Sequence, residues 1–134
     1  MIDYKKLIEN ALIARENSYS PYSNFKVGAC VLTDNQKYYL GTNVENSSYG
    51  GTICAERSAI STAISYGDKK IVAIAIVSSS GDYTFPCGIC RQVMAEFGDI
   101  EVVIAKSVED YKVFKISELL LYSFTCEDIK WEQL

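Results

Sequence analysis

The chain has 134 residues, is 49% hydrophobic and 22% charged, and carries a formal net charge of −4. Length and composition favour one folded domain over residues 1–134, with a hydrophobic core of its own. Proteins that bind nucleic acid normally carry a basic stripe, so the acidic balance argues against such a partner. No apolar run reaches the roughly 18 residues of a membrane span.

The N-terminus and the cysteine content both favour the cytoplasm as the compartment of this protein. The first six residues, MIDYKK, contain no apolar region of the kind that opens a signal peptide. The five cysteines are an odd number, which fits free thiols or a metal site better than a disulfide framework. We therefore expect a cytoplasmic protein with reduced cysteines.

The first half of the chain predicts a helix, a hairpin and a second helix. Apolar residues at helical spacing predict a helix over Asp3–Asn17, and turn-forming residues predict a loop over 18–24. Two strands, Phe25–Leu32 and Gln36–Asn43, would form a hairpin around residues 33–35. A helix is then expected from near Cys54 to near Gly67, a suitable C-cap.

The second half alternates strands with helices. The unbroken apolar run Ile71–Val77 is typical of a strand covered on both faces. The elements expected after it are a helix over Cys87–Phe97, strands over Ile100–Ala105 and Lys112–Lys115, and a short helix over Ile116–Leu121. This order predicts an α/β protein, a three-layer α/β/α sandwich whose five-stranded sheet is mixed because of the opening hairpin.

The cysteines form a divided set with a glutamate inside it. Cys54 stands two residues before Glu56, and Cys87 and Cys90 follow about thirty residues later. Three thiols can hold one zinc ion and leave its fourth position open, as a catalytic zinc requires. Because the chain contains no histidine, Glu56 is the candidate acid/base group.

Both cysteine segments are expected to open helices. Pro86 suits the first turn of a helix, and the spacing of Cys87 and Cys90 places both sulfurs on one helical face. Helix N-termini would stabilise the thiolates. Zinc with three thiolates has a net charge of −1, and we predict Arg57, rather than Arg91, as the main compensating charge.

Two other interpretations of the cysteines remain open. The pair Cys87 and Cys90 alone resembles a redox dithiol, although such motifs lack a third cysteine with an adjacent glutamate. A closed structural zinc would need a fourth ligand, either Cys30 or Cys126. Cys30 lies within a predicted strand, where it is expected to be a small buried hydrophobic residue.

Four segments together resemble the small homotetrameric cytidine deaminases, in order and with the right spacing. They are SPYSNFKVGA at 20–29, NVENSSYG at 43–50, TICAERSAI at 52–60 and PCGICRQV at 86–93. The resemblance implies a cytidine deaminase-like fold and one zinc per subunit, bound by Cys54, Cys87 and Cys90. It implies that Glu56 takes a proton from the attacking water and returns protons to ring N3 and the leaving amine.

The resemblance also implies the substrate-binding residues. Asn43 and Glu45 would bind the ribose 3′-hydroxyl, and Phe25 would form an aromatic wall against the base. Ala55 would offer a backbone contact to the base, and Tyr49 would lie near the sugar, either in its own site or in that of a neighbouring subunit. Phe124 is expected to close a neighbouring subunit's site, with Tyr122 as a competitor, because Leu121 stands where the family usually has proline.

The function implied is hydrolysis of cytidine and deoxycytidine to the uracil nucleosides and ammonia, in pyrimidine salvage, by a homotetramer with shared active sites. Ten tyrosines and five phenylalanines are more aromatic surface than a small core needs, which agrees with an oligomer. The alternatives are a deaminase of a modified nucleoside such as blasticidin S and, from another class, a non-catalytic interaction module stabilised by zinc.

Overall fold

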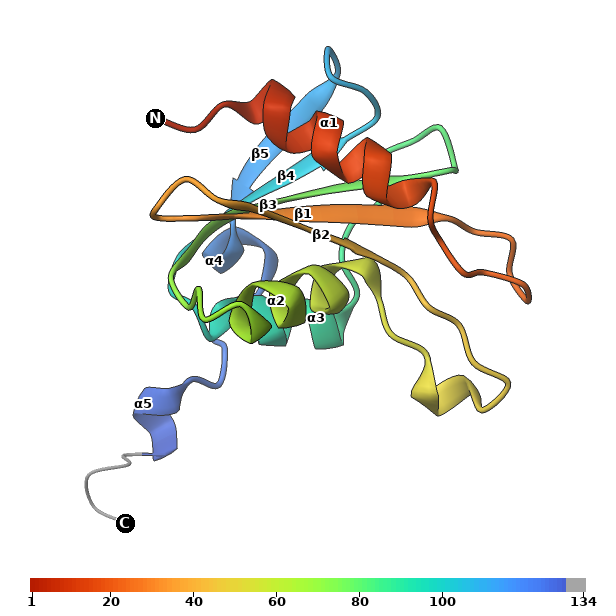
Figure 1. Ribbon diagram of the computed structural model, residues 1–134. Coiled ribbons are helices and arrows are strands. Elements are labelled where there is room, and N and C mark those ends of the chain that lie inside the picture. Colours follow the sequence, from red (N-terminus) through yellow and green to blue (C-terminus); the bar gives the residue numbers. More distant parts are fainter. Residues whose placement is uncertain (130–134) are drawn as a thin grey trace.

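The computed structural model describes residues 1–129, which form one mixed sheet with helices on both faces (Figure 1). The helices are α1 (Tyr4–Arg15), η1 (Tyr49–Gly51, a 3-10 turn), α2 (Ala55–Ser65), α3 (Gly88–Ala95), α4 (Ile116–Leu119) and α5 (Cys126–Ile129). The strands are β1 (Val27–Thr33), β2 (Tyr38–Thr42), β3 (Ile71–Ser78), β4 (Glu101–Ala105) and β5 (Tyr111–Lys115). None of the helices within 1–129 is long and apolar enough to cross a membrane.

The sheet has the order β2-β1-β3-β4-β5. The strands β1 and β2 pair antiparallel, as do β1 and β3, whereas β3 and β4 pair parallel because α3 lies between them in the chain. The last pair, β4 and β5, is antiparallel, since a short turn rather than a helix joins the two strands. The mixed α/β/α sandwich predicted from the sequence is confirmed.

Each face of the sheet has its own apolar core. The helix α1 covers one face and packs with Leu7 and Ile8 against Cys30 and Leu32. The helices α2 and α3 cover the other face, where Ile60 and Met94 belong to the larger cluster. Figure 1 shows the two helical layers on opposite sides of the strands, and α5 standing apart from both.

The predicted elements are present, and their ends differ by a few residues. Pro86 does not lie in the first turn of α3: Cys87 is the N-cap, so the proline precedes the helix. The final helix expected to reach Leu121 ends at Leu119, because Leu120 is already extended and Tyr122 has a positive φ of 52°. The structure adds two short elements that the sequence pattern did not predict, η1 and α5.

Candidate metal centre and adjoining pocket

Two helix N-termini bring the three predicted cysteines together. Cys54 is the N-cap of α2, and Cys87 is the N-cap of α3, with Cys90 in its first turn. The height of α2 above the sheet is set by Gly41 of β2, where a Cβ atom would lie 2.1 Å from the amide nitrogen of Ala59. Helix backbone and strand backbone are therefore in direct contact, which determines how close α2 lies to β2.

The three sulfurs are spaced as one zinc ion needs them. The Sγ atoms of Cys54, Cys87 and Cys90 all lie within 4.8 Å of one another. Those of Cys54 and Cys87 are 3.8 Å apart. A tetrahedron with zinc–sulfur bonds of about 2.3 Å has an edge of about 3.8 Å, so these thiols fit the ion.

No fourth ligand completes the cluster among residues 1–129. Cys30 is fully buried in the core on the α1 side of the sheet, and Cys126 is exposed in α5. Burial raises the pKa of the Cys30 thiol to about 12, which makes it a hydrophobic residue rather than a ligand. The arrangement therefore fits an open, catalytic site and argues against a closed structural one.

Glu56 lies in the first turn of α2 and is only 5% exposed. Burial, followed by the neighbouring Cys54 thiolate, raises the pKa of this carboxyl to about 7. The helix that provides Cys54 thus provides, two residues later, a carboxyl group largely removed from water. A carboxyl of this kind can both take up and release a proton near neutral pH.

The two arginines next to the site have different partners. Arg57 Nη2 lies 3.7 Å from Cys54 Sγ and 3.4 Å from the Thr52 carbonyl oxygen. The Cys90 thiol, and then Arg57 and Cys87, lower the pKa of Cys54 to about 5. Arg91 instead donates to the carbonyl oxygens of Pro86 and Leu119, at 2.8 and 2.7 Å, and so ties α3 to α4.

The segment that contains Asn43 and Glu45 is joined to the metal centre through the backbone. Val44 and Ile53 exchange two hydrogen bonds of 2.9 Å, and Ile53 directly precedes Cys54. The Asn43 side chain is buried: its Oδ1 accepts from Ser18 Oγ and the Val27 amide, and its Nδ2 donates to the Phe25 carbonyl. Asn43 thus holds the loop before β1 in place.

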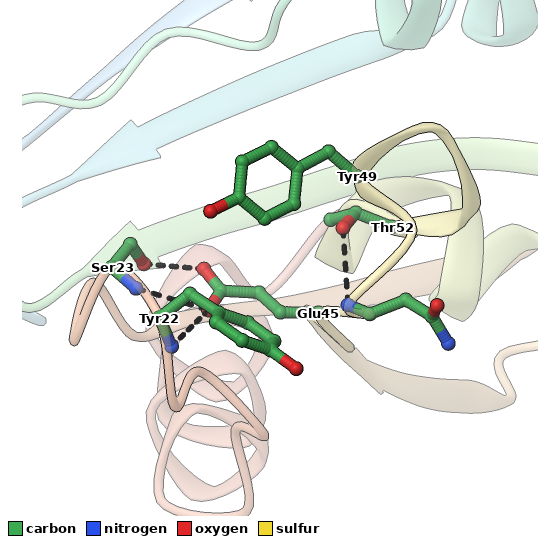
Figure 2. A pocket seen from close by; sticks show the side chains of 6 residues that line it. Tyr22, Ser23, Glu45, Tyr49 and Thr52 are labelled. Carbon is green, nitrogen blue, oxygen red and sulfur yellow. Dashed lines mark hydrogen bonds between the residues drawn. The ribbon is translucent and has the colours of Figure 1, made fainter.

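Glu45 lies at a cavity of about 310 Å³ lined by Tyr22, Ser23, Glu45, Asn46, Tyr49 and Thr52. Figure 2 shows the Tyr49 ring across the cavity from Glu45. The Tyr49 hydroxyl points toward Ser23 (Figure 2). The rings of Tyr22 and Tyr49 meet edge to face, with their centroids 5.9 Å apart. The cysteines, Glu56 and the remaining predicted substrate residues are not part of its lining.

The other predicted substrate residues occupy several elements. Phe25 is partly exposed just before β1, and Ala55 is fully buried as the first residue of α2. Phe124 is exposed, and its carbonyl accepts a 2.7 Å hydrogen bond from Gln92 of α3. Tyr122 makes no hydrogen bond with its side chain to residues 1–129 and is fully exposed. Neither C-terminal aromatic reaches the cavity of its own chain.

Residues 18–24, expected only to form a turn, make the closest contacts with the predicted sugar-binding pair. Ser18 binds Asn43, while Tyr22 and Ser23 bind Glu45. Asn24 has a positive φ of 57°, which asparagine tolerates and which closes this turn. The serines and the asparagine signalled a turn, but a sequence pattern does not show which carboxylate the turn encloses.

An open three-thiol metal centre beside a buried glutamate, on a mixed α/β/α sheet, defines a class of metal-dependent hydrolases. The family model described as the cytidine and deoxycytidylate deaminase zinc-binding region matches residues 1–106. A cytidine deaminase of Halalkalibacterium halodurans is 45% identical over 130 residues, covering 96% of this chain and 98% of that protein. The crystal structure of a Burkholderia pseudomallei cytidine deaminase has a TM-score of 0.86 and 44% identity, covering 92% and 100%.

The chain therefore belongs to the cytidine deaminase family. A cytidine deaminase of Sporosarcina psychrophila, 40% identical over 97% of this chain and 97% of that protein, agrees with this assignment. The resemblance expected from the four sequence segments is confirmed, and with it the fold and the single zinc ion for which the three thiols are suited.

Proposed function

We propose that this chain catalyses the zinc-dependent hydrolysis of cytidine and deoxycytidine to uridine and deoxyuridine, with release of ammonia. The observation that carries this proposal is the position of a buried carboxyl group, Glu56, two residues beyond the first of three clustered thiols. Cys54, Cys87 and Cys90 would hold the ion, which supplies an acidified water when bound.

The proton transfers are assigned to Glu56. Replacing the exocyclic amine by oxygen moves both protons of the attacking water: the first goes to ring N3, and the second, from the hydroxyl group formed on C4, goes to the leaving amine. A single buried carboxyl group can carry both protons in turn, because it delivers the first before it takes up the second. Ala55, whose backbone is fixed at the start of α2, would contact the base, and Phe25 would lie against its ring.

We assign sugar binding to the segment that contains Asn43 and Glu45 and that leads to the metal centre. Asn43 and Glu45 would bind the 3′-hydroxyl, and Tyr49, on the opposite side of the cavity, would lie near the ribose. A carboxylate accepts a hydrogen bond from a hydroxyl and repels a phosphate. A free nucleoside is therefore favoured over a 3′-linked nucleotide.

We further propose that residues 1–134 form one domain and that four copies assemble into a homotetramer in the cytoplasm, acting in pyrimidine salvage. The support for assembly is the exposure of large aromatic side chains that the family resemblance assigns to the site. Tyr49 is 76% exposed and Phe124 is 59% exposed in the isolated chain. In such a tetramer, Phe124 of one subunit would close the site of another.

The test of the proposed function is the ultraviolet absorbance of cytidine after addition of the purified protein, with metal content measured in parallel. We expect about one zinc per chain and loss of cytidine absorbance. Glu56→Gln should keep the zinc and lose turnover by at least about 10³-fold, because the proton carrier is gone while the ligands remain. Near-normal activity in that variant would rule out the assignment of Glu56.

A substrate panel separates the remaining functions. It contains cytidine, deoxycytidine, cytosine, the two monophosphates and blasticidin S. We expect turnover of the two nucleosides alone. Preferred turnover of blasticidin S would identify a deaminase of modified nucleosides, whereas tight zinc binding without turnover of any compound would identify an interaction module.

A further inference from the structure

The Glu45 carboxylate is held by three hydrogen-bond donors from one turn (Figure 2). The backbone N–H groups of Tyr22 and Ser23 both donate to Oε1, at 3.0 and 3.1 Å. The Ser23 hydroxyl donates to Oε2. The Ser23 hydroxyl, followed by the two amides, holds the pKa of Glu45 below its usual value, so the group is a carboxylate at neutral pH.

The Ser23 hydroxyl cannot turn away from Glu45 without losing a second bond. Its oxygen accepts a 3.0 Å hydrogen bond from the Phe25 amide, which occupies one lone pair. The single hydroxyl proton is then directed at Glu45. Ser23 therefore joins the residue assigned to the sugar with the backbone of the residue assigned to the base.

Counting the remaining hydrogen-bonding capacity shows what this turn leaves for a ligand. A carboxylate offers about four acceptor positions, of which three are filled, and the free one lies on Oε2 beside Ser23. The Asn43 oxygen has both positions filled, and its Nδ2 uses one of two protons. Glu45 thus keeps one acceptor position at the cavity, enough for one hydroxyl group, and Asn43, which does not line that cavity, keeps one donor.

We propose that Ser23 is a positioning residue for sugar recognition: its hydroxyl orients the Glu45 carboxylate so that Oε2 selects a nucleoside with a 3′-hydroxyl. This inference rests on the proposed function. It predicts that Ser23 affects only those substrates whose 3′-hydroxyl Glu45 can bind, because Ser23 itself is occupied by protein partners.

The turn has other anchors, so removing the hydroxyl is not expected to unfold it. Tyr19 receives a bond from the Glu45 amide and donates one to the Asn43 carbonyl, at 2.8 and 3.1 Å. The Asn24 amide donates to the Ser20 carbonyl at 3.0 Å. Ser23→Ala keeps all of these bonds, together with both amide bonds to Glu45.

The experiment compares deoxycytidine with 2′,3′-dideoxycytidine, which differ only in the 3′-hydroxyl. The measured quantity is the ratio of their kcat/KM values in the wild type and in Ser23→Ala, Ser23→Thr and Ser47→Ala. Ser47 is a control because it lies on the same segment as Glu45 and is exposed. Zinc content and Tm are measured for every variant.

We expect Ser23→Ala to lower this ratio about tenfold, the size of one lost hydrogen bond to a charged group, mainly through a higher KM for deoxycytidine. Ser23→Thr, which keeps the hydroxyl, and Ser47→Ala should keep the wild-type ratio. An unchanged ratio in Ser23→Ala, which includes the case of equal losses with both substrates, would overturn the role of Ser23 and leave the proposed function standing. A zinc-loaded wild type that deaminates neither nucleoside would overturn the proposed function and this inference together.

Discussion

At the scale of single residues, the structure separates two arginines that the sequence places in equivalent positions. Each directly follows a residue of the predicted site, and the charge argument applies to both. Arg57 lies 3.7 Å from the Cys54 sulfur, whereas Arg91 donates hydrogen bonds to the carbonyl oxygens of Pro86 and Leu119. Only Arg57 is placed to offset the surplus negative charge of three thiolates around one divalent ion.

Replacing Arg57 should weaken the hold on zinc without removing it. We expect Arg57→Ala to purify with about one zinc per chain and to release it to a chelator at least about tenfold faster than the wild type, as for other changes just outside a metal's ligands. Arg57→Lys keeps the charge and should lie between the two. Equal release rates in all three proteins would remove this role from Arg57.

At the scale of elements, the sequence predicts the helices and strands around the site. It predicts only some of the contacts through which these elements hold the site residues. Apolar runs and turn residues locate every strand to within two residues because each is bounded by a clear change in composition. The clustering of Cys54, Cys87 and Cys90 follows from two helix starts, those of α2 and α3, that lie close together on the same face of the sheet (Figure 1). The turn that encloses Glu45 was not predictable, because its hydrogen bonds depend on a tertiary contact 22 residues away.

The contact between α2 and β2 at Gly41 should be intolerant of a side chain. A Cβ atom there would meet the Ala59 nitrogen at 2.1 Å and the Ala55 oxygen at 2.6 Å, so α2 has to move. We expect Gly41→Ala to lose at least about 2 kcal/mol of stability and part of its zinc, because Cys54 moves with the helix. The matched control is Gly50→Ala, where a Cβ atom meets nothing within 4 Å and the change should stay within about 0.5 kcal/mol.

Thermal unfolding and zinc content per chain measure both effects. A Gly41→Ala protein as stable and as rich in zinc as Gly50→Ala would show that α2 is not positioned by this contact.

The hydrogen bond between Tyr4 of α1 and Glu101 of β4 should make stability depend on alkaline pH. This 2.5 Å bond, followed by burial, raises the pKa of Tyr4 from 10.0 to about 12. Below the pKa that Tyr4 has in the unfolded chain, the bond contributes fully to stability. Between the two values the unfolded chain loses a proton that the folded chain keeps, so the contribution falls as the pH rises.

We therefore expect Tyr4→Phe to cost about 1 kcal/mol near neutral pH, with a gap to the wild type that narrows steadily above about pH 10. Urea unfolding at a series of pH values measures the gap, with Tyr66→Phe, at an exposed tyrosine, as the control. A gap that stays constant into the alkaline range would contradict the assignment of this bond.

At the scale of the whole molecule, the aromatic residues are the feature that one chain does not explain. The fully buried core within residues 1–129 is built from aliphatic side chains, alanine, cysteine and methionine, and contains no tyrosine or phenylalanine. Near the C-terminus, Leu121, Tyr122 and Phe124 are exposed, and α5 stands apart from the sandwich (Figure 1). Apolar surface of this extent is typical of an interface between subunits.

If subunits share their sites, two inactive variants should restore each other. We propose co-expressing Glu56→Gln chains with Phe124→Ala chains under two affinity tags and isolating the mixed assemblies. When Glu56 and Phe124 of one site come from different chains, about a quarter of the sites in a random mixture combine both native residues, and activity should rise toward that fraction. When they come from the same chain, no site recovers. Tyr122→Ala in place of Phe124→Ala tests which aromatic closes the site, and a fully active monomer on dilution would contradict shared sites altogether.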